Sequence, residues 1–275
     1  MKKALFYLLL ALSLQGCGAK FVYNNLSMIT PWYVDDFVDL TREQEKQYQA
    51  HLKVIHQWHR QHELPEYHRL LTELLTHLDN EKLDRSFMSD HLLALRQRWQ
   101  VLIDQASPAL SEMASGLSDQ QVADMMAALE DANQERLKEQ DTPVEHSKDV
   151  VKGIKRWLGT LNKDQQALVE AFAEAHPDRS EMTVAAHRAF QQQLGVVLEN
   201  RAEDGFDARF KALIADPLAT PAGEVLIDAR MAAMEDRITL YQALWQGASD
   251  TQRDKVKRRL TDVIEDIEAL MVKQG

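Results

Sequence analysis

Histidine side chains are concentrated in one stretch of this 275-residue chain, where seven of the ten lie between residues 51 and 91. Within it, His56, His59 and Glu63 are spaced i, i+3 and i+7, so a helix would place them on one face. Imidazole and carboxylate groups arranged in this way could hold a zinc ion and activate water. The neighbouring Ile55 and Trp58 favour burial of the same helix, and the alternative is therefore a partly buried, amphipathic histidine face.

Other enzyme signatures are missing from the sequence. It contains no Gly-x-Ser-x-Gly motif and no glycine-rich phosphate loop. Carboxylate pairs such as Asp35-Asp36 have the character of solvated helix faces. We therefore assign no catalytic residue and expect no cofactor and no metal, with His56, His59 and Glu63 as the weak candidate for a metal site.

The first seventeen residues have the layout of a secretory signal peptide. Lys2 and Lys3 precede an apolar run, ALFYLLLALSL, which is too short to span a bilayer, and the chain then reads LQGC, ending at Cys17. This ending resembles the lipobox of bacterial lipoproteins. The resemblance implies that residues 1–16 are cleaved off and that Cys17 receives a covalent lipid with acyl chains such as palmitate.

The residues around this cysteine also indicate a location. Gly18 stands where an Asp would retain an enteric-type lipoprotein in the inner membrane, so we expect an outer-membrane protein that faces the periplasm. Its acyl chains, at about 0.8 kcal/mol per buried CH₂ group, would anchor it firmly to the membrane. Cys17 is the only cysteine, and an internal disulfide is therefore excluded.

The charge balance limits the partners of the chain. The formal net charge is −11, the loss of Lys2 and Lys3 makes it more negative by two, and there is no basic block. Such a chain is a poor candidate for binding nucleic acid. A composition of 45% hydrophobic and 27% charged residues is normal for a globular protein with a packed core.

Apolar residues recur with helical spacing along most of the chain, and no alternating run of β-branched residues competes with this pattern. We therefore predict an all-α fold of about ten helices, packed as antiparallel helical hairpins, with no sheet. The first helix is expected to break near Leu40-Thr41. The expected helices are 33–62, 65–78, 81–106, 118–139, 143–158, 162–175, 179–200, 204–214, 221–246 and 249–272.

The seven prolines fit this division, because each can lie at the start of a helix or between two helices. Helices are expected to start at Pro31, Pro108, Pro143, Pro217 and Pro221, and to be separated at Pro65 and Pro177. The chain would then consist of a lipid-attached N-terminal segment at 17–32 and a single all-α domain at 33–275. A sub-boundary near 140–143 is the alternative.

A short pattern opens four of the expected helices. Each copy has an apolar residue, a helix-capping residue and a glutamine three positions later, which makes a capping box. The copies are Leu40–Gln44, Leu117–Gln121, Leu161–Gln165 and Ala248–Gln252. Generic helix starts are the simplest interpretation. The pattern also resembles the Leu-Thr-x-x-Gln repeat of small stress-induced periplasmic chaperones, and lipase-specific foldases are similar as envelope-anchored helical arms, which implies a folding-helper role.

A wider set of motifs follows the expected lipidation site. It comprises Tyr23-Asn24-Asn25, Pro31-Trp32-Tyr33, Leu40-Thr41-x-x-Gln44, Trp58-His59-Arg60 and Glu63-Leu64-Pro65-x-Tyr67. Together these motifs resemble a family of proteobacterial lipoproteins that has no assigned function. The resemblance implies an envelope protein and supplies no catalytic residues.

The segment next to Cys17 is dense in aromatic and apolar residues. Tyr23, Trp32 and Tyr33 are its candidate binding residues. One interpretation is that the segment packs across the helices as a core element, in which case Trp32→Ala should cost about 3–5 kcal/mol. The other is an exposed patch that docks on an envelope protein or on the lipid interface.

These observations favour binding over catalysis. We expect a lipid-anchored, periplasm-facing envelope protein that acts by protein binding, as a scaffold or a chaperone-like folding helper. Its partners would be the membrane, through Cys17, and an unidentified envelope protein. The alternative is a metal-dependent or hydrolytic periplasmic enzyme centred on His56, His59 and Glu63.

Overall fold

The computed structural model describes residues 17–80 and 83–272, so the expected signal peptide at 1–16 lies outside the described residues. The predicted all-α fold is confirmed, because the described residues form eleven helices and no strand. In chain order the helices are α2 (Cys17–Asn24), α3 (Leu26–Asp35), α4 (Arg42–Asp79), α5 (Arg85–Ser115), α6 (Asp119–Lys138), α7 (Pro143–Leu158), α8 (Lys163–Ala175), α9 (Ser180–Glu199), α10 (Phe206–Ala215), α11 (Pro221–Gln246) and α12 (Asp250–Val272).

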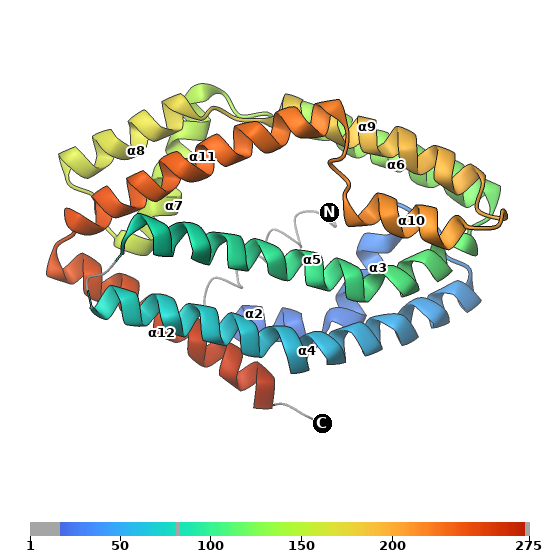
Figure 1. Ribbon diagram of the computed structural model, residues 1–275, viewed down its shortest axis with the longest axis horizontal. Helices are drawn as coiled ribbons and strands as arrows, with labels where there is room; N and C mark the ends of the chain where they lie inside the picture. The colour runs from blue at the N-terminus through green and yellow to red at the C-terminus, as the bar shows by residue number, and fades with distance from the viewer. Residues whose placement is uncertain (1–16, 81–82, 273–275) are drawn as a thin grey trace.

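The helices contact one another in a closed circuit. Helix α4 packs on α5, followed by α10, α9, α11, α8, α7 and α12, and α12 returns to α4 (Figure 1). Helix α6 lies along α9, while α2 and α3 lie against α12 and α4. None of the described helices is long and apolar enough to cross a membrane.

Hydrophobic packing is distributed around this circuit. One buried cluster, which includes Leu198 and Phe206, joins α5, α6, α9 and α10. A second, around Val169, joins α7, α8 and α11, and a third, around Trp245, joins α4, α11 and α12. Each cluster holds neighbouring helices together at a different place in the ring.

Three of the helix boundaries expected at prolines are wrong. Pro65 lies inside the continuous α4, Pro108 inside α5 and Pro31 inside α3. A proline inside a helix removes one backbone hydrogen bond. In α4 that loss is offset by burial of the adjoining apolar Leu64.

The remaining expectations at the helix ends have mixed outcomes. Thr142 and Thr220 cap α7 and α11, and Pro143 and Pro221 are the first residues of those helices, as predicted. Pro217 starts no helix, because it lies in the turn before α11. The break near residue 40 is confirmed, since α3 ends at Asp35 and α4 begins at Arg42. The segment 17–32, expected only as a lipid-attached stretch, is largely helical.

Two of the four capping-box glutamines bond to each other. Gln44 and Gln121 exchange hydrogen bonds, with Nε2 to Oε1 distances of 3.2 Å and 2.8 Å. Each Nε2 also donates to a backbone carbonyl just before the other motif, that of Gly116 or Asp39. Each Oε1 also accepts the backbone N–H of its own capping residue. Both amide groups thus use all of their donors and acceptors.

The same arrangement occurs a second time. Gln165 and Gln252 exchange hydrogen bonds of 3.0 Å and 2.9 Å. They donate to the carbonyls of Gly247 and Thr160, which hold the same position relative to their motifs as Gly116 and Asp39. The four copies are therefore capping boxes, as predicted, and they also form two reciprocal pairs that join segments 77 and 87 residues apart.

Breaking one of these pairs should destabilise the protein. Gln165→Ala should lower the free energy of unfolding by about 2 kcal/mol, because Gln165 is buried and the substitution removes its bonds to the Gly247 carbonyl and to the Gln252 side-chain amide. Urea denaturation measures the change. The control is Gln166→Ala, which removes a bond to Glu170 on the helix surface and should cost less than about 0.5 kcal/mol.

A double-mutant cycle separates the pair from its surroundings. Gln165→Ala combined with Gln252→Ala should show a coupling of about 1 kcal/mol or more, because the two side chains share hydrogen bonds. Additive effects of the two substitutions would contradict the reciprocal arrangement.

Candidate functional site

The predicted histidine face lies on α4, where the N-terminal segment covers it. The Tyr23 hydroxyl is 2.9 Å from His59 Nδ1, and its ring packs edge-on against His56 at 4.6 Å between centroids. Burial lowers the pKa of both histidines and raises the pKa of Tyr23 to about 12. These histidines are therefore neutral at pH 7 and pack against an aromatic ring.

Arg60 ties three helices together beside this face. One guanidinium nitrogen donates to the Leu270 carbonyl on α12, and the other donates to Asn24 Oδ1 at 3.0 Å on α2. The guanidinium also lies 5.0 Å from the centroid of the Tyr23 ring. The Tyr-Asn-Asn and Trp-His-Arg motifs thus meet, and their contacts attach the N-terminal segment to α4 and α12.

Glu63 is one turn further along α4 and is 1% exposed. Its Oε1 lies 3.4 Å from Arg98 Nη1, while its Oε2 has no hydrogen-bond partner in the described structure. Burial raises its pKa, and the nearby Arg98 opposes that shift. Within residues 17–80 and 83–272, no three His, Cys, Asp or Glu side chains converge to hold a metal, so His56, His59 and Glu63 do not form a ligand set.

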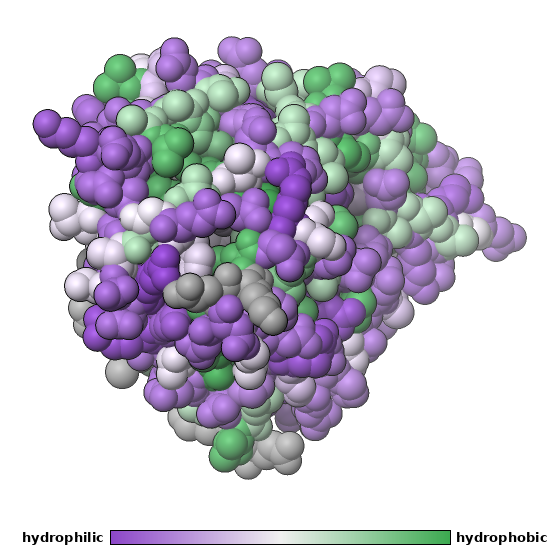
Figure 2. Space-filling view, turned by 60° about the vertical axis from the view of Figure 1, so that its left-hand side comes forward, coloured by the Kyte–Doolittle hydropathy of each residue, from purple (hydrophilic) through white to green (hydrophobic). Residues whose placement is uncertain are grey.

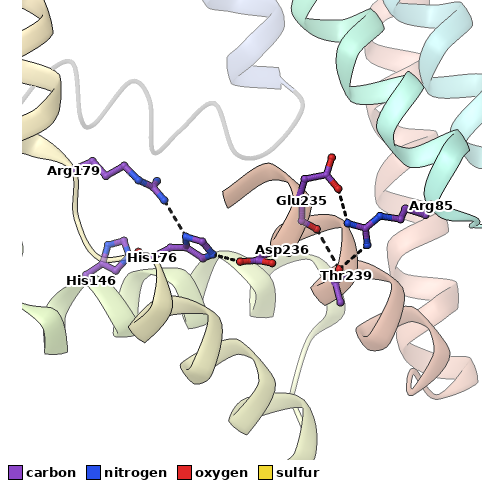
Figure 3. Close-up of polar contacts among 7 residues, drawn as sticks. All are labelled: Arg85, His146, His176, Arg179, Glu235, Asp236 and Thr239. Atoms are coloured by element: carbon purple, nitrogen blue, oxygen red, sulfur yellow. Dashed lines mark hydrogen bonds and ion pairs between the residues drawn. The ribbon is translucent and has the colours of Figure 1, made fainter. Parts of the chain in front are cut away.

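A polar cluster that the sequence patterns did not indicate lies beside α11. His176 Nε2 is 2.8 Å from Asp236 Oδ2, and His176 Nδ1 accepts from Arg179 Nη2 at 3.2 Å (Figure 3). His146 on α7 donates to the His176 carbonyl at 2.8 Å. Since a guanidinium can only donate, the ring proton of His176 lies on Nε2 and is donated to Asp236.

This arrangement differs from a hydrolytic triad in one decisive respect. An Asp–His pair activates a nucleophile through the second ring nitrogen. In this protein that nitrogen meets Arg179, which is a cation without a transferable proton at neutral pH. The cluster therefore connects α7, the α8–α9 link and α11, and a second contact, from Arg85 to Glu235 and Thr239, connects α11 to α5 (Figure 3).

Helix α11 carries a stripe of partly exposed polar side chains. Arg230, Arg237 and Tyr241 are spaced i, i+7 and i+11, which places them on one helix face. Tyr241 is 36% exposed, yet surrounding protein raises its pKa by burial. His187 and Arg230 are also exposed, and burial lowers the pKa of each. These side chains are thus accessible to water and are still partly desolvated by nearby protein.

Basic side chains from five parts of the chain lie near one another beside this stripe. Burial is the first cause that lowers the pKa of Arg230, and the charges of Arg136, Arg179 and Arg96 are the next. Arg136 and Arg230 also lower the pKa of His187. Neither Arg136 nor Arg230 forms an ion pair within the described part of the chain. We call these five residues, Arg96, Arg136, Arg179, His187 and Arg230, the inner basic surface.

Two open hollows lie on the described part of the surface. One of about 350 Å³ adjoins the inner basic surface and is lined by Arg136, Glu135, Glu139, Ala132 and Ser180. The other, of about 330 Å³, lies between α4 and α12. Both are open and mixed in polarity, and neither encloses a set of converging catalytic groups. The face in Figure 2 likewise shows hydrophobic residues scattered among hydrophilic ones.

The candidate binding residues of the N-terminal segment separate into two groups. Tyr23 points toward α4 and its histidines, whereas Trp32 and Tyr33 are 47% and 45% exposed. Cys17 is the first residue of α2. Tyr23 and the buried Ile29 therefore pack against the other helices, as expected of a core segment, whereas Trp32 does not. The inner basic surface was missed in the sequence, because its five residues come from four separate helices and the α8–α9 link.

Tyr23 and Trp32 should differ in their contribution to stability. Tyr23→Ala should lower the free energy of unfolding by about 2 kcal/mol, because it removes ring packing and the bond to His59. Trp32→Ala should change it by less than about 1 kcal/mol, because the indole is half exposed. Thermal and urea unfolding of the two variants measure the difference, and equal losses would contradict the separation.

Glu63 should make stability depend on pH. The pKa of Glu63 is higher in the folded protein than in the unfolded chain, so ionising this carboxyl group destabilises the fold. The free energy of unfolding therefore falls as the pH rises from the unfolded-state pKa to the folded-state pKa, and it stays lowered at higher pH. Glu63→Gln removes this cost, so the variant should gain stability relative to the native protein between pH 4.5 and pH 8. Urea unfolding across this range measures the gain. Glu45→Gln, at an exposed position on α4, should show no such trend.

Comparison with known proteins gives a family and no function. No curated protein and no solved structure matches this chain significantly. A family of unknown function, DUF6279, matches residues 36–222, which is more than half of the sequence and extends from the end of α3 to the start of α11. The proposed resemblance to a family without an assigned function is thereby confirmed, and the chain belongs to DUF6279.

Proposed function

We propose that this protein is a lipid-anchored envelope protein of the outer membrane that faces the periplasm and binds other polypeptides without chemically altering them. The anchor would be the acylated Cys17, as the LQGC sequence indicates. The observation that carries the binding role is the inner basic surface. Four guanidinium groups, those of Arg96, Arg136, Arg179 and Arg230, lie near enough for the first three to repel the last, in a chain whose net charge is −11.

The chemistry of this surface favours acidic polypeptide segments. Guanidinium groups pair with carboxylates through two parallel hydrogen bonds, and Arg136 and Arg230 have no ion pair of their own among the described residues. Tyr241, on the same stripe of α11, adds an aromatic surface for apolar side chains. A surface that combines these groups binds extended chains with mixed acidic and apolar composition.

The four glutamine motifs support a chaperone-like form of this role. They resemble the Leu-Thr-x-x-Gln repeat of small periplasmic chaperones. The inner basic surface gives this acidic chain a place where acidic polypeptide segments can bind. The alternative, a metal-dependent or hydrolytic enzyme at His56, His59 and Glu63, has no ligand set or nucleophile to support it among the described residues.

Charge reversal on the inner surface tests the proposal. Arg136→Glu combined with Arg230→Glu should weaken binding of an acidic unfolded probe, carboxymethylated α-lactalbumin, at least tenfold, because it replaces two attractive charges by repulsive ones. Fluorescence anisotropy at low salt measures the affinity. The control carries Lys46→Glu and Lys53→Glu, two exposed positions on α4, and has the same net charge.

The control distinguishes the inner surface from a general charge effect. It should retain the affinity of the native protein, and raised salt should weaken native binding. Equal loss of binding in both double variants would show that only net charge matters. No binding of the probe by the native protein would overturn the proposed role.

A further inference from the structure

Helices α2 and α3 join the expected lipid site to the helical ring without a spacer. Helix α2 begins at Cys17, and Lys20 forms an ion pair of 2.6 Å with Asp266 on α12. Gln49 on α4 donates to the Ser27 carbonyl of α3 at 3.1 Å. With the Tyr23 and Arg60 contacts, these bonds hold both helices against the ring. A lipid on Cys17 would therefore keep the ring at the membrane surface.

The outward face of these two helices is apolar. Phe21, Met28, Trp32 and Tyr33 are each between 45% and 51% exposed, although residues of this size and kind are usually buried. Met28 and Trp32 are one helical turn apart on α3, so they lie on the same side of the helix. The four side chains are called the outer aromatic patch below.

Charge is almost absent from this segment. Lys20 is the only charged residue between 17 and 33, and its ammonium group is paired with Asp266. In the whole chain 27% of residues are charged. The acidic residues resume directly after the patch, at the exposed Asp35, Asp36 and Asp39. The nearly uncharged segment therefore ends abruptly at these acidic residues, which follow it on the C-terminal side.

We infer that the outer aromatic patch lies in the interfacial layer of the lipid bilayer, so that α2 and α3 dock the ring on the membrane in one orientation. Trp and Tyr favour this layer, where the ring is in apolar surroundings and the polar atom reaches the headgroups. The patch is continuous in sequence with the expected lipid anchor and has no unpaired basic group for an acidic protein partner. This inference rests on the lipid anchor of the proposed function and is independent of polypeptide binding.

Tryptophan quenching by brominated lipids tests the docking. The lipidated full-length protein is reconstituted in protein-free phosphatidylethanolamine and phosphatidylglycerol vesicles whose acyl chains carry bromine near the headgroup. Bromine should quench part of the tryptophan emission, and Trp32→Ala should remove most of that quenching. Trp99→Ala is the matched control, because Trp99 is 63% exposed on α5 and should not contribute.

A second variant keeps the reporter and changes its surroundings. Phe21→Ser combined with Met28→Ser leaves Trp32 in place, and should reduce its quenching and shift its emission to longer wavelength. Quenching that Trp32→Ala leaves unchanged would overturn the docking. So would protection of Trp32 only in native envelopes, since that result points to a protein partner.

The lipid anchor and the polypeptide binding are checked in the same preparation. Mass spectrometry establishes acylation of Cys17, and an unacylated protein without quenching contradicts both the anchor and the docking. The α-lactalbumin probe is titrated onto the same vesicles. If Trp32→Ala abolishes quenching by the brominated lipid while probe binding is unchanged, the result supports the membrane docking and says nothing against polypeptide binding. If the native protein is quenched but does not bind the probe, only the proposed polypeptide binding is overturned.

Discussion

The two reciprocal glutamine pairs are the constraint on which the ring depends. A primary amide has two donor hydrogens and two acceptor sites, and burying it is costly unless all are used. A capping box alone uses only one acceptor site of the glutamine. The other bonds come from a second motif, so the start of α4 must meet the start of α6, and the start of α8 must meet that of α12.

The remaining contacts follow from these two junctions. Once α4 and α12 are fixed at one end each, they lie along each other, with an ion pair between Asp79 and Lys257 and a hydrogen bond between His68 and Glu268. Their common side receives α2 and α3 through Arg60 and Lys20. The opposite part of the circuit, formed by α5, α6, α9 and α11, carries the inner basic surface. The outer aromatic patch and the inner basic surface thus lie on different parts of the ring.

Local signals in the sequence predict local structure well in this chain. The caps at Thr142 and Thr220 and the four capping boxes depend on neighbouring residues, and all of them form. The continuity of α4 through Pro65 could not be predicted, because it depends on burial of Leu64 and Leu70 by other helices. Pairing of the glutamines has the same origin, since the repeat is visible in the sequence but the partner of each copy is not.

The candidate site was less predictable for a related reason. The spacing of His56 and His59 correctly placed them on one face, but their partner, Tyr23, comes from another helix. A metal site would need ligands from such neighbours, and none is present in the described residues. The inner basic surface is hidden in an acidic average composition, because Arg96, Arg136 and Arg230 are separated by dozens of residues and carry no common motif.

The pairing of α4 with α12 has a consequence for the order in which the protein is made. Arg60 and His68 bond to residues 210 and 200 positions later in the chain. Because a ribosome releases the N-terminal part first, the side of α4 that packs on α12 stays uncovered until α12, the last helix, has been synthesised. Contacts between such distant residues slow folding. The ring can therefore close only after the last helix, α12, has been synthesised.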